Sequence, residues 1–351
     1  MMERKDLDYL DSLKCIVILC IVLNHSIQYK WNVYKILTND CQNPIMIFIS
    51  GIVFSYCIVN MGKYSTLQNL LQKKLKRLII PLVLTLLFWY IPIMKLVNVF
   101  VTVEPYEQPL YKILITNIMG LNLDQLWFVY ALFLMYFLLW LVIKKTGLLN
   151  SHKGELLVIG IAYLLNLFLH VKSTQYFCIS NIMRYMIFFV GGYIYNTEAQ
   201  HLDRGKDFKR WFLIGAILLV VSIYIYDYNT SFIAGKTFDG NIIVGAVGAC
   251  LEVFKQFGLL FIVCYFIKWL YENTMCLKNT FSDYLIKRSF RIYLFHQPIV
   301  RCLLPIIQRV VSPDSNIENF LISVITAITS VIIALMVSCF IDIAVRFIPK
   351  K

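Results

Sequence analysis

Charge is scarce in this sequence of 351 residues: 15% are Asp, Glu, Lys or Arg, whereas 59% are hydrophobic. Long hydrophilic segments are also missing, because the two longest, 102–123 and 196–210, are too short to fold around a core of their own. The ten cysteines form no C-x-x-C pair and have no metal-ligand spacing with histidine, and no glycine-rich phosphate loop is present. The composition therefore excludes an ordinary soluble domain, and we predict no metal site.

Apolar runs long enough to cross a bilayer recur along the whole chain instead. Backbone polar groups in lipid must be satisfied internally, so these runs predict helices. We predict an all-α polytopic membrane protein, a bundle of about ten transmembrane helices that forms one domain over residues 1–351. The predicted spans are 13–29, 43–60, 78–101, 124–143, 155–171, 181–195, 211–227, 243–267, 285–308 and 319–346.

The net charge of +13 follows the predicted topology rather than a nucleic-acid surface. With ten spans, 23 of the 33 Lys and Arg residues fall in segments on the same side as the N-terminus. Such a bias marks the cytoplasmic side, which places both termini in the cytoplasm. The first apolar run has no small-residue cleavage pattern after it, so we expect it to be retained as a span rather than removed as a signal peptide.

The first predicted span carries a histidine at membrane depth. Inserting full charges there costs roughly 2.5 kcal/mol or more, so intramembrane ionisable residues tend to mark function. Lys14 and His25 are eleven residues apart, which returns them to nearly the same helix face about 16 Å apart. One stripe then contains Asp11, Lys14, Ile18, Val22 and His25. A neutral imidazole can take a proton from a hydroxyl, as acyl transfer to an alcohol requires. The alternative is a packing histidine beside an interfacial lysine.

A basic run, Lys73–Arg77, opens the third predicted span. Membrane orientation alone would place such a cluster at a cytoplasmic helix start. A phosphorylated donor would also be held there by Lys73, Lys76 and Arg77, with Arg making bidentate contacts and Lys acting as a point charge. The sequence leaves both interpretations open.

A second intramembrane histidine, His296, lies about one helical turn beyond Arg291 in the ninth predicted span. It would orient the first histidine, position a substrate, or satisfy a kink beside Pro298. Trp127 belongs to a segment that is typical of an interfacial aromatic belt.

Taken together, these segments resemble the acyltransferase-3 family of integral-membrane O-acyltransferases. The similar pieces occur in the family's order and cover nearly the whole chain. They are Leu10-Asp11-Ser12-Leu13-Lys14, Asn24-His25-Ser26, Ile47-Phe48-Ile49-Ser50-Gly51, Lys76-Arg77-Leu78-Ile79-Ile80-Pro81, Leu126-Trp127-Phe128 and Ile292-Tyr293-Leu294-Phe295-His296-Gln297-Pro298.

The resemblance implies a ten-helix bundle that takes an acyl group, usually acetyl, from cytoplasmic acyl-coenzyme A (acyl-CoA). It also implies that the acceptor is a sugar hydroxyl of a surface glycan or of its lipid-linked precursor. Carried over by position, His25 is the base, Lys14 is its basic partner, and Lys76 and Arg77 help to hold the donor's phosphates. Our further candidates are Asp11 as a catalytic residue beside Lys14, Lys14 and Lys73 as donor-binding residues, and Ser50, Trp127, Arg291 and His296 as residues that contact or support the substrate. Lys stands at position 14 where the family more often has Arg, and Lys cannot make the planar two-point contact of Arg.

Two mechanisms and one rival function remain open at this stage. His25 either deprotonates the acceptor for direct attack on the thioester or carries the acyl group as a covalent intermediate, and we favour direct transfer. The expected partners are acyl-CoA, the glycan acceptor and membrane lipid, with no nucleic acid, and the expected location is the cell membrane; the oligomeric state is open. The rival is a transporter or flippase of glycan precursors, although the sequence has no paired half-repeats.

Overall fold

The computed structural model describes residues 8–27, 32–99, 108–121, 126–171, 176–198, 210, 213–218, 220–221, 242–274, 277–311 and 316–346. Every regular element in this part of the chain is helical, as predicted. The long helices are α1 (Asp8–Ser26), α2 (Asn32–Ser55), α8 (Trp127–Thr146), α9 (His152–Val171), α10 (Ile179–Glu198), α13 (Ile242–Asn273), α14 (Thr280–Val311) and α15 (Asn316–Arg346). Shorter elements are η2 (Tyr56–Asn60), α7 (Leu110–Ile118), η6 (Leu148–Asn150) and η7 (Tyr176–Cys178).

The third predicted span, 78–101, belongs to a longer helix that begins at Leu67 and has two wide π-helical turns. This helix consists of α3 (Leu67–Lys74), η3 (Leu75–Ile79), α4 (Ile80–Thr85), η4 (Leu86–Tyr90) and α5 (Ile91–Asn98). Pro81 and Pro92 follow the two π turns. A proline lacks the N–H that the residue four positions earlier needs, and its ring crowds that residue's carbonyl. A π turn relieves this conflict without breaking the helix. Lys76 and Arg77 therefore lie in η3, within a widened turn.

Within the part of the chain that the structure describes, seven stretches are long and apolar enough to cross a membrane: Asp8–Ser26, Cys41–Asn60, Leu67–Asn98, Trp127–Thr146, Tyr176–Thr197, Cys250–Asn273 and Glu318–Ile343. They indicate a multi-pass membrane protein and match seven of the ten predicted spans. The predicted spans 155–171 and 285–308 are helical, as parts of α9 and α14, but are not among the seven; α14 carries charges along its first half. The predicted span 211–227 lies largely outside the described residues.

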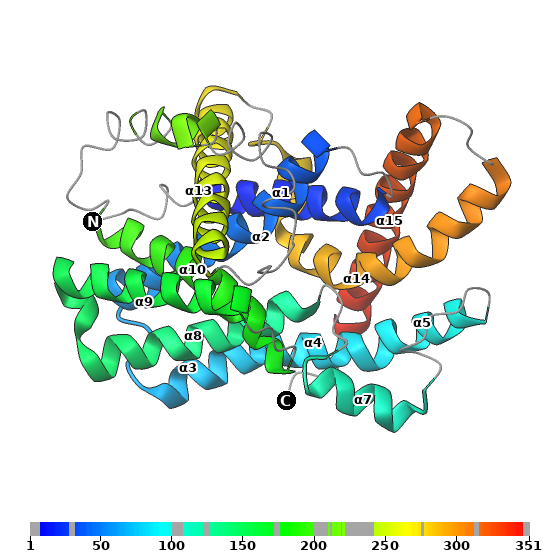
Figure 1. The fold of residues 1–351 in the computed structure, drawn as a ribbon. Coiled ribbons are helices and arrows are strands. Elements are labelled where there is room, and N and C mark those ends of the chain that lie inside the picture. The colour runs from blue at the N-terminus through cyan, green and yellow to red at the C-terminus, as the bar shows by residue number, and fades with distance from the viewer. Residues whose placement is uncertain are drawn as a thin grey trace.

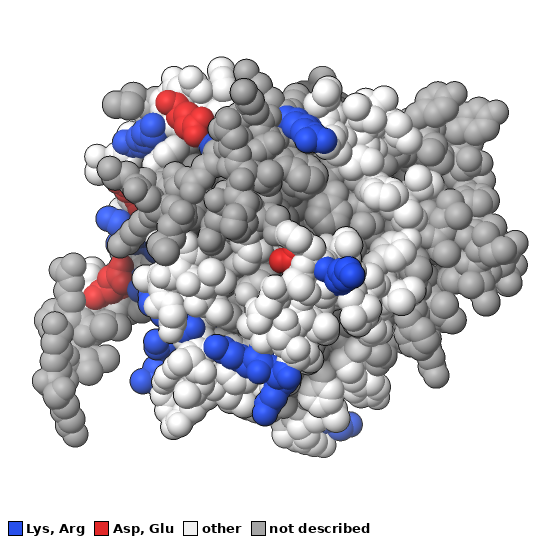
Figure 2. All heavy atoms as spheres, turned by 90° about the vertical axis from the view of Figure 1, so that its left-hand side faces the viewer, with Lys and Arg blue, Asp and Glu red and all other residues white. Residues whose placement is uncertain are grey.

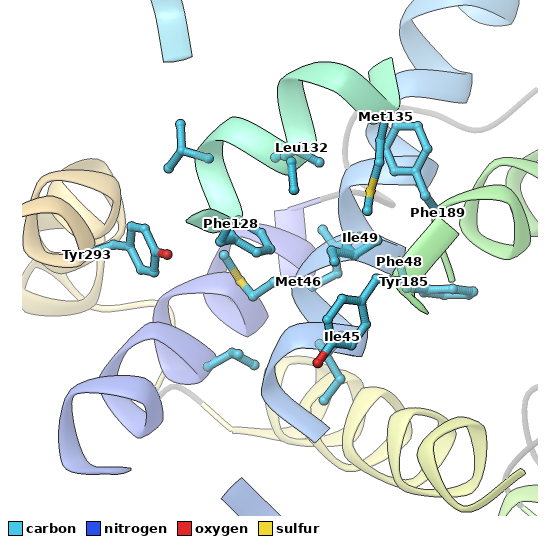
Figure 3. Packing of buried hydrophobic residues seen from close by; sticks show 14 of the residues in the cluster. Ile45, Met46, Phe48, Ile49, Phe128, Leu132, Met135, Tyr185, Phe189 and Tyr293 are labelled. Atoms are coloured by element: carbon cyan, nitrogen blue, oxygen red, sulfur yellow. The ribbon is translucent and has the colours of Figure 1, made fainter. Parts of the chain in front are cut away.

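Figure 1 shows α8, α9 and α10 running roughly side by side, whereas α13 and α15 cross the view steeply. Among the described residues, buried apolar and aromatic side chains form one large core cluster. Figure 3 shows this packing where α2 meets α8 and α10. The labelled side chains there are Ile45, Met46, Phe48 and Ile49 from α2, Phe128, Leu132 and Met135 from α8, and Tyr185 and Phe189 from α10.

The direction of α1 relative to its two neighbours decides which side chains meet. Lys14, near the start of α1, interacts electrostatically with Cys57, just beyond the end of α2, so α1 and α2 are antiparallel. Tyr271 interacts with both Asp8 and Asp283, in the first turns of α1 and α14. Because α1 and α14 also pack against each other, they run parallel. Consequently α2 and α14 run in opposite directions.

Helices α2 and α10 approach each other closely at two glycines. A Cβ added at Gly51 would overlap the carbonyl oxygen of Phe189, and one added at Gly192 would overlap that of Phe48. In contrast, a Cβ at Gly160 in α9 would meet no atom within 4 Å. Glycine is thus required where α2 and α10 touch, and not at Gly160.

Substituting Gly192 by alanine is expected to destabilise the folded protein by about 1–3 kcal/mol, the typical cost of an overpacked site. Gly160→Ala is the matched control, and its better helix propensity should leave stability unchanged or raise it by up to about 1 kcal/mol. Thermal unfolding in detergent, followed by intrinsic fluorescence, measures both. Equal midpoints for the two variants would show that α2 and α10 do not pack through this contact.

Candidate active site

Three basic side chains converge where α1 begins. Lys14 interacts electrostatically with Arg77, and Lys74 interacts with both. We call Lys14, Lys74 and Arg77 the cationic cluster. Asp11 forms an ion pair with Lys14 at 3.4 Å, but its side chain is 62% exposed, so the pair is weak. The structure therefore brings Asp11, Lys14 and Arg77 into one region.

Lys74 is the member of this cluster that the sequence prediction missed. Its side chain is buried, and its Nζ lies 3.2 Å from the centroid of the Tyr136 ring, 5.3 Å from that of Tyr64 and 5.7 Å from that of Phe54. Cation–π attraction to three rings offsets part of the cost of burying this ammonium group. The sequence signal was present, since Lys74 and Arg77 are three residues apart and share a helix face.

Lys73 and Lys76 are exposed on either side of Lys74. The ammonium of Lys73 lies 5.6 Å from the Tyr64 ring centroid. Further exposed lysines, Lys144 and Lys145, lie at the end of α8. Helix α8 ends on the left-hand side of Figure 1. Figure 2 shows the molecule from that side, with several Lys and Arg side chains gathered among uncharged ones. One end of the bundle is therefore basic.

His25 and His296 meet at the other end of α1. The rings of His25 and His296 have centroids 5.4 Å apart and planes tilted by 39°. Helix α1 is continuous from Lys14 to His25, so these residues are about 16 Å apart along one face, as the stripe predicted. The sequence placed the histidines in spans far apart in the chain, and the fold brings them together.

The backbone of α14 fixes the proton of His296. Its Nδ1 lies 2.8 Å from the carbonyl oxygen of Tyr293 and 3.2 Å from that of Ile292. A carbonyl oxygen only accepts hydrogen bonds, so Nδ1 carries the proton and donates it. In the neutral ring, Nε2 is then an acceptor. This atom is fully buried and has no hydrogen-bond partner among the described residues.

The remaining predicted site residues lie in separate surroundings. Ser50 donates to the carbonyl of Met46 and also reaches Tyr136, the ring beneath Lys74, so it borders the cationic cluster. The Trp127 ring stacks on Tyr185, with centroids 5.6 Å apart.

Arg291 points to α15 rather than to the histidines. It forms an ion pair with Asp342, which also binds Arg288 at 3.0 Å, and it donates to the Ser338 carbonyl at 3.1 Å. These contacts tie α14 to α15.

Comparison with protein families matches the chain to a model described as an acyltransferase domain, over residues 7–339. The match covers nearly the whole chain and includes both the cationic cluster and the two histidines. No curated protein and no solved structure matches the chain.

Proposed function

Because the chain belongs to the acyltransferase-3 family, we propose that it transfers an acyl group, by default acetyl, from cytoplasmic acyl-CoA to a sugar hydroxyl. The acceptor is a surface glycan or its lipid-linked precursor, and the protein resides in the cell membrane. Family membership favours this enzyme over a flippase of glycan precursors.

The observation that carries the proposal is the arrangement along α1. Lys14, with Lys74 and Arg77 beside it, groups three basic side chains at one end, and His25 lies about 16 Å away on the same face. Phosphates are bound by such cation clusters. A donor with its phosphates at the cluster can extend its thioester arm along α1 toward His25.

In this mechanism His25 is the general base. Its imidazole takes the proton of the acceptor hydroxyl as the oxygen attacks the thioester carbonyl carbon. The carbon–sulfur bond then breaks, and the coenzyme A (CoA) thiolate leaves. Lys14, Lys73, Lys76 and Arg77 hold the donor's phosphates, with Lys74 as an inner contact. Asp11 keeps Lys14 oriented.

The other predicted residues support the base His25 and the basic residues that hold the donor. Ser50 borders the cationic cluster through Tyr136, and Trp127 offers an aromatic face to the acceptor. Arg291 is a positioning residue: its ion pair with Asp342 holds α14, and hence His296, against α15.

The proposed topology follows from the basic end of the bundle. A chain of ten spans, forming one domain over 1–351, places the cationic cluster and both termini in the cytoplasm. His25, at the opposite end of α1, then lies nearer the outer face. The acyl group would cross the membrane inside the protein to reach an exported acceptor.

Purified protein in lipid vesicles, supplied with labelled acetyl-CoA, tests the proposal. We expect saturable donor binding and release or transfer of the label, with no label lost from protein-free vesicles. If the folded protein neither binds acetyl-CoA nor releases label from it, the acyltransferase assignment is wrong.

A further inference from the structure

Trp89 ties the helix that carries the proposed donor-binding residues to the helix that carries His296. The indole Nε1 of Trp89, in η4, donates to the carbonyl oxygen of Phe295 in α14 at 3.1 Å. The Trp89 ring also meets the Phe295 ring edge-on, with centroids 5.5 Å apart. Phe295 directly precedes His296 in the chain. The proposed mechanism gives Trp89 no part, although it contacts the backbone beside the histidine pair.

The turn of α14 around His296 needs support from side chains. Pro298 has no N–H to donate to the carbonyl four residues earlier, and its ring crowds that carbonyl. Side chains add hydrogen bonds to two neighbouring carbonyls. Nδ1 of His296 donates to the Tyr293 carbonyl at 2.8 Å, and Trp89 donates to that of Phe295. Trp89 therefore helps to fix the part of α14 from which the His296 ring projects.

Two helices connect the cationic cluster to the histidine pair over similar distances. Along α1, Lys14 and His25 are about 16 Å apart. Arg77, which interacts with Lys14, is followed twelve residues later by Trp89, a rise of about 18 Å along the other helix. The segment from α4 to α5 packs against α14, and α14 packs against α1 (Figure 1). Trp89 thus lies at about the level of His25, with His296 between them.

The position of His296 bears directly on that of His25. The two rings are in contact, with centroids 5.4 Å apart, and the His296 side chain is fully buried. A close-packed side chain cannot shift without moving its neighbours. A general base must lie within hydrogen-bond reach of the proton that it removes, and a misplacement of about 1 Å can slow a reaction about 100-fold. The placement of His25 therefore depends on how firmly α14 holds His296.

We propose that Trp89 is a positioning residue for acyl transfer, which holds His296 and, through the ring contact, the base His25. The inference rests on the proposed function and adds a residue to it. One helix carries Arg77 near its start and Trp89 farther along, so it sets the distance between the donor's phosphates and the base.

The substitution Trp89→Phe tests this role, because phenylalanine keeps an aromatic ring and loses the N–H donor. In vesicles with labelled acetyl-CoA, the turnover of bound donor should fall about 2- to 10-fold, the factor for one neutral hydrogen bond. The dissociation constant of acetyl-CoA should stay at the wild-type value, since about 18 Å of helix separates Trp89 from Arg77.

Trp140→Phe is the matched control, because the buried Trp140 donates a similar indole hydrogen bond, to the Tyr64 carbonyl at 2.8 Å. Each variant loses one such bond, so both should lower the midpoint of thermal unfolding by a similar amount. Only Trp89→Phe should slow the turnover of bound donor.

His296→Leu removes the link through which Trp89 acts. It should slow the turnover of bound donor at least as much as Trp89→Phe does. Adding Trp89→Phe to His296→Leu should then change the rate by less than about 2-fold, because residues that act through one contact are not additive. If the two effects multiply instead, Trp89 does not act through His296.

A second measurement needs no acyl acceptor. Diethyl pyrocarbonate carbethoxylates neutral imidazoles, and peptide mass spectrometry gives the rate of this reaction at His25. The rate should rise about 2- to 10-fold in Trp89→Phe, because the histidine pair is held less firmly. In Trp140→Phe it should equal that of the wild type.

The inference is wrong if folded Trp89→Phe matches the wild type in the carbethoxylation rate of His25, or if Trp140→Phe changes turnover and carbethoxylation as much as Trp89→Phe does. Failure of the proposed function looks different: the wild type would not bind acetyl-CoA, whereas carbethoxylation of His25 would still respond to Trp89→Phe.

Discussion

Replacing His25 by alanine is expected to lower acyl transfer by about 10²- to 10⁴-fold, the usual contribution of a general base. Donor affinity should not change, because the cationic cluster proposed to bind the phosphates lies about 16 Å away along α1. The measurement is the rate of label release from acetyl-CoA in vesicles, together with the dissociation constant of the donor.

His152→Ala is the matched control for this substitution. His152 lies at the start of α9, where its side chain is 81% exposed and pairs with Glu155 at 3.4 Å. It should transfer acyl groups at the wild-type rate. Comparable rates for His25→Ala and wild type, with both proteins folded, would remove His25 from the chemistry and leave it as a packing residue.

Removing the charge of Lys14 is expected to weaken acetyl-CoA binding by about 10- to 100-fold, since hydrogen bonds to charged groups contribute about 1.5–3 kcal/mol each. Lys14 is the member of the cationic cluster that shares a helix face with His25. The turnover of bound donor should change much less than the affinity. Titration of Lys14→Ala with acetyl-CoA, followed by single-turnover kinetics, separates the two effects.

Two further variants sharpen this result. Lys14→Arg should keep or improve donor affinity, because Arg contacts phosphate with two parallel hydrogen bonds. Lys144→Ala removes an exposed lysine at the end of α8 and should have no effect. An equal loss in Lys14→Ala and Lys144→Ala would mean that the basic face attracts the donor only through its overall charge.

The fold class could be predicted from the sequence because membrane spans are set by local composition. The apolar runs of α8 and α15 are long enough to be predicted as membrane spans from composition alone. The unbroken helix of α1 from Lys14 to His25 could be predicted in the same way. The exact spans were harder to predict. The span 285–308 was predicted from its apolar run, but α14, which contains it, carries charges that pair with α15 and is not among the seven apolar stretches, although it packs against α1 and α15.

The candidate site could be predicted only where one helix carries it. Lys14 and His25 are eleven residues apart, and this spacing alone predicts that they share one face of a helix. The meeting of His25 with His296 depends on the parallel packing of α1 and α14, which no local pattern encodes. Likewise, the sequence does not show that Lys74 turns inward onto Tyr136 while its neighbours Lys73 and Lys76 face outward.

The most direct test of the account is to trap the donor's sulfur at position 25. The variant His25→Cys is treated with CoA activated as its pyridyl disulfide, so that the cysteine thiolate attacks the disulfide and expels thiopyridone. Because the native chain contains ten cysteines, peptide mass spectrometry must locate the adduct. We predict a CoA adduct at residue 25 that excess acetyl-CoA suppresses, whereas labelling of the exposed residue 152 in His152→Cys should not change when acetyl-CoA is added. A folded His25→Cys protein with no adduct at position 25, or with an adduct that excess acetyl-CoA does not suppress, would contradict a donor arm that runs along α1 to His25.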